Sequence, residues 1–407
     1  MGFELPLGTE TVECSLPSCR VTTARPPGGE AVDVREAARD ALRDPHGPPL
    51  TDRIEPSDSV SIVVTDVTRA TPEDVLLDVL VAAFERAGVD SDQISVVIGL
   101  GLHRPMTDEE IESALGEHAD LAVNHDPDRT VTVGEIEGCP VELFEPITET
   151  DVLCSTGMVE PHQYAGFSGG AKTALIGAGG ESQLRYTHGP EMLARDGVRL
   201  GRIDGNPFRE FLDSGGDLID VEFCLNVTHG PAGIMGASAG DHRAVVRDLA
   251  ATAREALSVE VTAEYDAVVA GVGAPKDANL YQTTRGPTYI VLGARNPLRP
   301  DGRVVVPATL SEGAGEGRGE QRFYERLSAA SSPEELYQEM KDGYEPGAQR
   351  AFVLARTLRE HDVWITNSDT PEIVEECLMH AAKGVEDAIE PESDVLVVPD
   401  ALNTLLV

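Results

Sequence analysis

The sequence predicts an α/β protein of two domains. Apolar runs long enough for buried strands alternate with stretches of helical periodicity, which is typical of parallel strands covered by helices. The alternation stops at a long charged helix and then starts again, so two α/β units are the simplest account. A chain of 407 residues is long enough to build a hydrophobic core in each unit.

The first half of the chain contains buried strands separated by amphipathic helices. Its N-terminal segment, up to residue 57, is rich in proline, glycine and acidic residues, with short strand-like pieces such as TVECSLP. A threonine that can act as an N-cap, followed by acidic residues, marks the start of one short helix. The expected strands are 59–67, 93–103 and 150–157, and the expected helices are 72–88, 107–118 and 242–260.

The second half repeats this alternation. The glycine-rich segment 313–320 is expected to be a mobile loop. We therefore place one domain at 1–260 and a second at 261–397, and expect the tail at about 398–407 to pack back on the first. The expected strands are 266–273, 302–308, 362–368 and 393–400, and the expected helices are 279–293, 332–343, 347–361 and 371–384.

Acidic residues outnumber basic ones by 71 to 32, which gives a formal net charge of −39. Such a negative field repels nucleic acids and anionic membranes, so we expect no partner of either kind. The acidity is spread along the whole chain, which suits a salt-rich cytoplasm where screening relieves the self-repulsion. We therefore expect a halophilic protein.

Neither a signal peptide nor a membrane span is visible in the sequence, so a cytoplasmic location is expected. The cysteines are scattered without a CxxC pair, at positions 14, 19, 139, 154, 224 and 377. We expect reduced and mostly buried thiols, and no zinc–cysteine site.

Two motifs directly follow expected strands of the first domain. TDVTRATP places Asp66, Thr68 and Arg69 on the turn into a helix, where open α/β sheets bind ligands. A helix cap and a surface arginine are the alternative. GLGLHRP puts glycines in a strand, often a sign that a ligand or another backbone approaches closely, and it ends with His103. A purely structural role is the alternative for this histidine.

The most unusual stretch is EPHQYAGFSGGAKTALIGAGGESQLRYTHG. It places His162 and His188 on either side of a glycine-rich loop that carries Lys172. GFSGGAKT lacks the spacing of a Walker A loop, but its backbone N–H groups could bind one phosphate. An ordinary glycine turn is the alternative. Two imidazoles, one amine and so many glycines in a short span are hard to justify by packing, so we expect a functional site.

The corresponding motif of the second domain is GVGAPKDANLYQTTRG, which follows its first strand. Asn279 can cap a helix on which Gln282 and Arg285 are three residues apart and share a face. An amide and a guanidinium projecting together suit a carboxylate. A solvated helix face is the alternative.

Together, the motifs resemble those of the nickel-pincer nucleotide-dependent lactate racemases and related 2-hydroxyacid racemases and epimerases. The likeness runs in order from TDVTR through GLGLHRP and EPHQYAGFSGGAK to THG and PKDANLYQ, across most of the chain. It implies an isomerase of two α/β domains with the active site in the cleft between them. It also implies nickel and a nickel-pincer nucleotide (nickel pyridinium-3,5-bisthiocarboxylic acid mononucleotide), with cofactor-synthesis proteins as transient partners.

The resemblance implies how this cofactor would be held. Lys172 would form a thioamide link to it, His188 would be the protein's nickel ligand, and the glycine loop would hold its phosphate. Soft sulfur donors with one imidazole agree with the metal preferences of nickel. The residues assigned to cofactor binding are Lys172, Asp66, Thr68, Ser168, Gly169 and Gly170.

The resemblance also implies the chemistry. His103 and His162 match the two catalytic acid–base histidines, one for each enantiomer. Hydride would leave C2 for the cofactor, and its return to the other face of a planar 2-keto acid would invert the centre. We expect lactate as the substrate, with a larger 2-hydroxy acid such as malate or a sugar acid as the alternative. The residues assigned to substrate binding are Arg69, Gln282, Arg285 and Tyr164.

The chain departs from the family pattern at two positions. Arg285 stands where lactate racemases usually carry a lysine, which keeps the charge but changes the pocket shape. Pro346 stands at the position of the usual lid tryptophan, which leaves room for a larger substrate with another polar or anionic group.

Two functions of other classes are the alternatives from the sequence: a hydrolase and a regulatory module. A zinc-dependent hydrolase could use the three histidines, although no acidic base lies close in sequence as in HExxH. A nucleotide-binding regulatory module could use the glycine loop, although it would not need His103, Arg69 and Gln282 in register.

Overall fold

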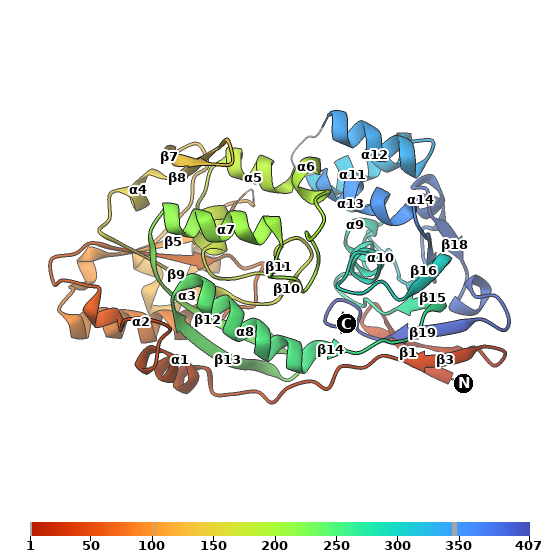
Figure 1. Ribbon diagram of the computed structural model, residues 1–407, viewed down its shortest axis with the longest axis horizontal. Helices are drawn as coiled ribbons and strands as arrows, with labels where there is room; N and C mark the ends of the chain where they lie inside the picture. Colours follow the sequence, from red (N-terminus) through yellow and green to blue (C-terminus); the bar gives the residue numbers. More distant parts are fainter. Residues whose placement is uncertain (1, 102, 344–347) are drawn as a thin grey trace.

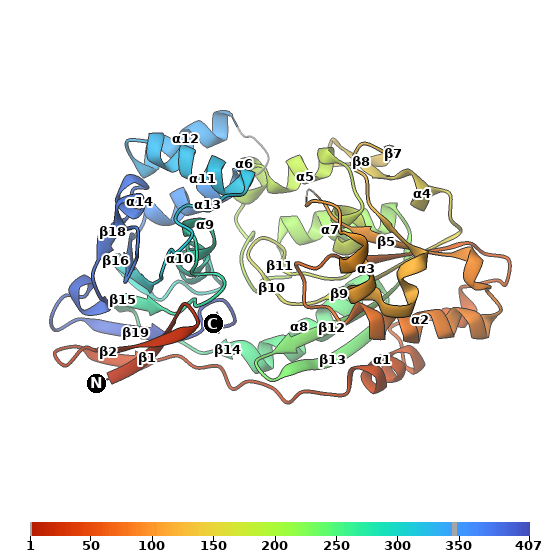
Figure 2. The ribbon, with the colours of Figure 1, turned by 180° about the vertical axis from the view of Figure 1, so that it is seen from behind.

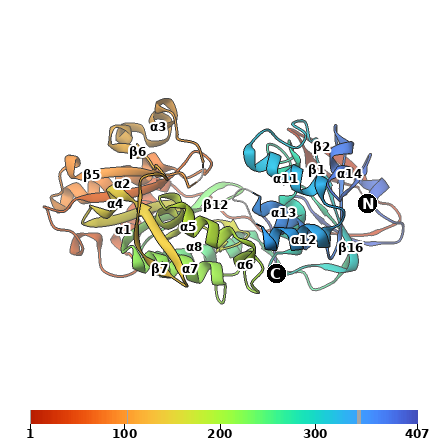
Figure 3. The same cartoon turned by 90° about the horizontal axis from the view of Figure 1, so that it is seen from above.

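The computed structural model describes residues 2–101, 103–343 and 348–407 of the protein. Two α/β units lie side by side, each built on a six-stranded sheet with helices packed on it (Figure 1). Both chain termini lie with the second unit, as the view from above also shows (Figure 3). The expected α/β class is confirmed.

The first sheet is parallel except at one edge, where its outermost strand runs antiparallel. Its strand order is β13 (Gly233–Gly240), β12 (Val221–Gly230), β9 (Val152–Met158), β4 (Val60–Thr65), β5 (Ile94–Gly99) and β6 (Ala122–Asn124). The helices of this half of the chain are α1 (Val34–Arg43), α2 (Glu73–Ala87), α3 (Asp108–Leu115), α4 (Glu145–Thr148), α5 (Glu181–His188), α6 (Pro190–Leu193), α7 (Pro207–Leu218) and α8 (His242–Leu257). Two hairpins complete it, β7 (Thr130–Ile136) with β8 (Cys139–Phe144) and β10 (Pro161–His162) with β11 (Gly166–Phe167).

The central strand β4 shows why an apolar run becomes a strand here. Its side chains alternate between the two faces of the sheet. Ile62 and Val64 pack in one hydrophobic cluster with Phe84 of α2, whereas Val63 packs in another with Phe211 of α7. Both faces are therefore covered by helices, as expected for a strand without polar alternation.

The second sheet is parallel throughout. Its strand order is β18 (His380–Ala382), β17 (Asp362–Thr366), β16 (Leu298–Pro307), β15 (Tyr265–Ala270), β19 (Asp394–Val398) and β3 (Arg20–Thr23). Its helices are α9 (Leu280–Thr283), α10 (Arg285–Val291), α11 (Arg318–Ala329), α12 (Pro333–Asp342), α13 (Gln349–Leu358) and α14 (Pro371–Glu376).

The sequence predicts residues 2–23 in a unit spanning 1–260, but in the structure they belong to the second unit, where β3 joins the sheet and the preceding hairpin packs on it. The hairpin of β1 (Gly2–Leu7) and β2 (Glu10–Ser15) covers one face of that sheet (Figure 2). Leu5 and Cys14 pack there in one cluster with Val269 of β15. The chain then crosses to the first unit, so the second sheet buries this face with a segment far away in sequence.

Two expected elements of the second unit also differ in extent. The expected loop at 313–320 ends early because α11 begins at Arg318, and Glu320 accepts a hydrogen bond from the N–H of Gly317 at 2.8 Å. The helix expected at 371–384 ends at Glu376 and is followed by β18.

The C-terminal tail returns to the junction of the two units. β20 (Leu405–Leu406) pairs in parallel with β14 (Ser258–Val259), which directly follows α8. All six cysteines lie within the described ranges and are free, and all except the half-buried Cys19 are buried. Among the helices described, none combines the length and the apolar character that crossing a bilayer requires.

Candidate active site

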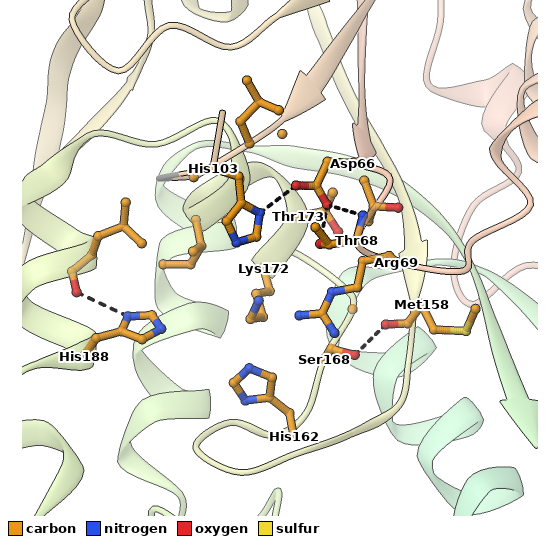
Figure 4. A pocket seen from close by; sticks show the side chains of 18 of the residues that line it. Asp66, Thr68, Arg69, His103, Met158, His162, Ser168, Lys172, Thr173 and His188 are labelled. Carbon is orange, nitrogen blue, oxygen red and sulfur yellow. Dashed lines mark hydrogen bonds and ion pairs between the residues drawn. The ribbon is translucent and has the colours of Figure 1, made fainter. Parts of the chain in front are cut away.

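A cavity of about 250 Å³ lies at the carboxyl ends of the central strands of the first sheet (Figure 4). Thr65, Gly99 and Met158, the last residues of β4, β5 and β9, all line it. Open α/β sheets bind ligands at this edge. Gln349, from α13 of the second unit, lines the same cavity, so the site reaches both units.

Most of the residues assigned from the sequence meet in this cavity. In Figure 4, Lys172 lies between His103 and His162, with His188 on one side and Arg69 on the other. The assigned residues that line the cavity are Asp66, Thr68, Arg69, His103, His162, Ser168, Gly169, Lys172 and His188. The assigned residues outside its lining are Gly170, Tyr164, Gln282 and Arg285.

Asp66 orients His103. The Nδ1 atom of His103 lies 2.6 Å from Oδ2 of Asp66, whose other oxygen accepts hydrogen bonds from the backbone and hydroxyl of Thr68. Burial alone would raise the pKa of Asp66, but the hydrogen bonds from His103 and Thr68 outweigh it and lower that pKa. With Nδ1–H donated to a carboxylate, Nε2 of His103 keeps a lone pair and can accept a proton. Asp66 does not cap α2, because Pro72 is the N-cap residue, so the capping alternative is excluded.

Glu160 holds Arg69 at the cavity through an ion pair that is not among the sequence-based expectations. Arg69 forms an ion pair with Oε1 of Glu160, and Oε2 of Glu160 lies 3.2 Å from Nε2 of His229. Burial acts to raise the pKa of Glu160, but His229 and Arg69 lower it overall. Glu160 lies two residues before His162 in the EPH of the glycine-rich motif. An acidic residue so close to a site histidine was the feature of the sequence that could have indicated its role.

His162 has the opposite hydrogen-bonding state to His103. It lies in the β10–β11 hairpin, where its Nδ1 accepts the backbone N–H groups of Tyr164 at 3.3 Å and Ala165 at 3.1 Å. A ring nitrogen that accepts N–H groups carries no proton, so the neutral ring carries its proton on Nε2. Burial, followed by the charges of Lys172 and Arg69, holds the pKa of His162 well below its ordinary value. His162 is therefore neutral and a hydrogen-bond donor.

Lys172 is an amine poised between its charged and neutral forms. Burial, followed by the positive charges of Arg69 and Arg209, lowers its pKa to about 7. It follows the tight turn at Gly169 and Gly170, whose φ angles are +79° and +62°. These backbone angles favour glycine.

Gly170 serves the packing of this loop. Its N–H donates to Oδ1 of Asn226 at 2.7 Å, and a Cβ atom at this position would lie 2.6 Å from the carbonyl oxygen of His242. The N–H of Gly170 is thus taken by the protein, and its assignment to cofactor binding finds no support in the geometry. The glycines of GLGLHRP show the expected close approach, because a Cβ at Gly99 would lie 3.1 Å from the Cα of Gly177.

His188 ends α5 with its Nδ1 3.2 Å from the carbonyl oxygen of Leu184. Donation from Nδ1 leaves the Nε2 lone pair free, the usual arrangement of a metal-binding histidine. Burial, followed by the charge of Lys172, lowers the pKa of His188 to about 4. The ring is therefore neutral at ordinary pH and available as a ligand.

The substrate-binding residues assigned to the second unit, Gln282 and Arg285, do not line the cavity. Asn279 caps α9 as expected, because its side chain accepts the N–H of Gln282 at 3.0 Å. Oε1 of Gln282 and Nε of Arg285 are buried without a hydrogen-bond partner among the described residues. Pro346, at the position of the expected lid, lies outside the described residues.

The three cavity histidines do not form a compact metal site with one another. In the described ranges, the group of potential ligands close enough to share one ion consists of Asp78, Glu117 and His118, none of which lines the cavity. Asp78 already pairs with Arg35 and His118. The geometry therefore does not favour the zinc-hydrolase reading.

Comparison with known proteins matches both halves of the chain to one family. Residues 7–201 match the lactate racemase N-terminal domain, and residues 260–405 match the lactate racemase C-terminal domain. The chain belongs to the lactate racemase family. It is an enzyme, a racemase, and hence an isomerase.

Relatives within the lactate racemase family are distant but match along their length. The chain is 26% identical to the lactate racemase of Thermoanaerobacterium thermosaccharolyticum over 99% of both chains. It is also 26% identical to that of Lactiplantibacillus plantarum, over 86% of this chain and 85% of the relative. The lactate racemase apoprotein structure from T. thermosaccharolyticum has the same fold, with a TM-score of 0.88, 24% identity and full coverage of both chains. A Thermotoga maritima protein structure is similar at a TM-score of 0.65 and 16% identity, over 90% of this chain and 96% of that one.

Proposed function

We propose that the protein is a nickel-pincer nucleotide-dependent racemase that inverts C2 of a 2-hydroxy acid, with lactate as the first substrate to test. The observation that carries this proposal is the placement of His103 and His162 on opposite sides of Lys172 in one cavity (Figure 4). Inversion needs a group that can hydrogen-bond the substrate oxygen on each side of the carbon, and His103 can also accept the proton of that oxygen. The names of the relatives support lactate as the substrate.

The residues around Lys172 fit the nickel-pincer nucleotide. An amine with a pKa of about 7 is partly neutral at neutral pH and can attack an acyl carbon to form a covalent link. The Nε2 atom of His188 would bind nickel, and Ser168 with Gly169 would lie against the nucleotide. When bound, the group would accept the hydrogen of C2 with its electron pair and return it.

The two catalytic histidines would act on the substrate oxygen. Nε2 of His103 would accept the hydroxyl proton, and Asp66 would stabilise the imidazolium that results. Nε2–H of His162 would donate a hydrogen bond to the oxygen when the opposite face is presented, and the hydroxyl proton would return from the imidazolium of His103. Arg69, oriented by Glu160, would bind the carboxylate next to C2.

Substitution of individual histidines in cofactor-loaded protein tests this proposal. Protein made together with cofactor-synthesis proteins should interconvert D- and L-lactate, measured by chiral chromatography. His103→Ala and His162→Ala should each lower kcat by about 10²–10⁴-fold while nickel content stays near normal. His188→Ala should lose nickel.

His118→Ala is the matched control, because this imidazole also pairs with an aspartate, at 2.9 Å from Asp78, but does not line the cavity. It should keep activity and nickel. Loss of nickel from His103→Ala or His162→Ala would contradict the assigned roles.

A further inference from the structure

Two arginines lie beside the cavity at the junction of the two units. Arg350 follows the cavity residue Gln349 on α13 and is only 2% exposed. Its guanidinium lies 3.3 Å from Oε1 of Gln163, in the hairpin that carries His162, and 3.2 Å from the hydroxyl of Thr284. Arg285 is the next residue after Thr284 and begins α10. The two side chains are therefore held where the units meet.

Neither arginine has an acidic partner among the described residues. Arg209, equally buried, has Asp213 within 3.4 Å and donates to the carbonyl of Phe167. By contrast, no ion pair within the described ranges includes Arg285 or Arg350. In all three arginines Nε is buried without a hydrogen-bond partner among the described residues. Burying a cation without a counter-charge is costly, so such a site normally receives an anion. Acidic residues are abundant in this chain, yet none of those that the structure describes forms an ion pair with either arginine.

Further polar groups around these arginines are also unsatisfied. Oε1 of Gln282 and the hydroxyl of Tyr164 are buried without partners among the described residues. Burial, followed by the charges of Arg285 and Arg69, lowers the pKa of Lys276, so a third cation is close by. The charge of Glu160 also acts on the pKa of Lys276, but this carboxylate already forms an ion pair with Arg69.

Tyr164 connects this cationic group to the reacting centre. Its ring packs edge-on against the rings of His162, at 5.7 Å, and His188, at 5.8 Å. The charges of both Arg285 and Arg350 reach its hydroxyl. The guanidinium of Arg350 also lies 5.1 Å from the ring centre of Tyr281, which fixes its plane. An anion bound by the two arginines would therefore be separated from His162 by the side chain of Tyr164.

We infer that Arg350 and Arg285 bind a second carboxylate, so the preferred substrate is a 2-hydroxy dicarboxylic acid and not lactate. This inference rests on the proposed racemase function. Arg69 would bind the carboxylate next to C2, and the paired guanidinium groups would bind the distal one. Arg285 thereby keeps the substrate-binding role expected from the sequence, here toward the distal carboxylate, and Arg350 enters the site as a new residue.

The test compares L-malate with L-lactate on the cofactor-loaded protein. Binding is measured by titration calorimetry and inversion by chiral chromatography, so the two readouts are independent. Wild type should bind and invert malate better than lactate. Arg350→Gln should weaken malate binding and lower kcat/KM for malate on the order of 10–100-fold, as expected for loss of a charge-assisted hydrogen-bonded pair. Lactate should change much less, and Arg350→Lys should recover part of the malate preference.

Arg356→Gln is the matched control. Arg356 lies on the same helix and also bridges to the first unit, by donating to the carbonyl of Leu193, but it is not part of the arginine pair. Its loss should leave the malate-to-lactate ratio unchanged. Should Arg350→Gln fail to fold, Arg285→Gln tests the same subsite with the same expected selectivity.

Two results would overturn the inference: wild type that binds malate no more tightly than lactate, or Arg350→Gln that weakens both acids equally. Wild type that binds malate through Arg350 but inverts neither acid would support the subsite and refute the racemase function instead.

Discussion

His103, His162 and His188 carry the same imidazole, but each has a different partner at Nδ1. A carboxylate makes Nε2 of His103 a proton acceptor, and backbone N–H groups make Nε2 of His162 a donor. A carbonyl oxygen leaves Nε2 of His188 free for a metal. The surroundings of each ring, and not its residue type, therefore distinguish the three proposed roles.

Asp66→Asn should test how His103 is oriented. An amide cannot stabilise the imidazolium and permits the wrong tautomer, so kcat should fall by about 10²–10⁴-fold with nickel content unchanged. The kcat–pH profile should also shift, which a purely structural role would not cause. Asp78→Asn is the control, because Asp78 pairs with His118 away from the cavity. Equal activity of both variants would refute the role of Asp66.

Lys172→Met should stabilise the apoprotein. A folded-state pKa of about 7 means that the unfolded chain binds more protons between that pH and the ordinary lysine pKa of 10.5, so stability rises with pH across this window. Below this pH window the amine is charged in both the folded and the unfolded state, so the full free-energy cost of burying its charge applies. Removing the amine should therefore raise the free energy of unfolding by on the order of 1–3 kcal/mol at pH 6, and by less at pH 9. Urea unfolding at both pH values measures this, and a larger gain at pH 9 would contradict the assigned pKa.

At the scale of elements, the sequence predicted what depends on local pattern. β4, β5 and β9 lie where apolar runs predicted them, and the turns after β4 and β5 carry Asp66 and His103 into the cavity. Pairing between distant segments left no local signal: β3 joins β19, and Glu160 meets Arg69 across 91 residues. The junction of the units left no local pattern either, so the positions of Gln349 and Arg350 could not be predicted from the sequence.

Gly170→Ala should show that the glycine loop is built by packing. The added Cβ would lie 2.6 Å from the carbonyl of His242, at a φ of +62° that disfavours alanine. We expect the apoprotein to lose on the order of 1–3 kcal/mol in urea unfolding. Gly236→Ala is the control, because its Cβ would meet Leu249 only at 4.0 Å. Equal stability of the two variants would contradict this account of the loop.

At the scale of the molecule, a net charge of −39 surrounds a site that concentrates cations. Self-repulsion of the surface should make the fold depend on salt, because the Debye length falls from about 10 Å at 0.1 M to about 3 Å at 1 M. We predict that the Tm of the apoprotein rises as KCl increases from 0.1 M to 2 M. Differential scanning calorimetry measures this, and a Tm that stays constant or falls would argue against adaptation to high salt.

The central claim is that C2 is inverted by moving its hydrogen with the electron pair, while the histidines handle only the hydroxyl proton. The most direct test follows optical rotation and C2 deuterium content together, by polarimetry and NMR, as the cofactor-loaded protein acts on L-malate and L-lactate in D₂O. The account predicts loss of optical rotation with the original hydrogen retained at C2. Deuterium entering C2 as fast as rotation is lost would instead mean that a protein base removes the C2 proton, and would contradict the account.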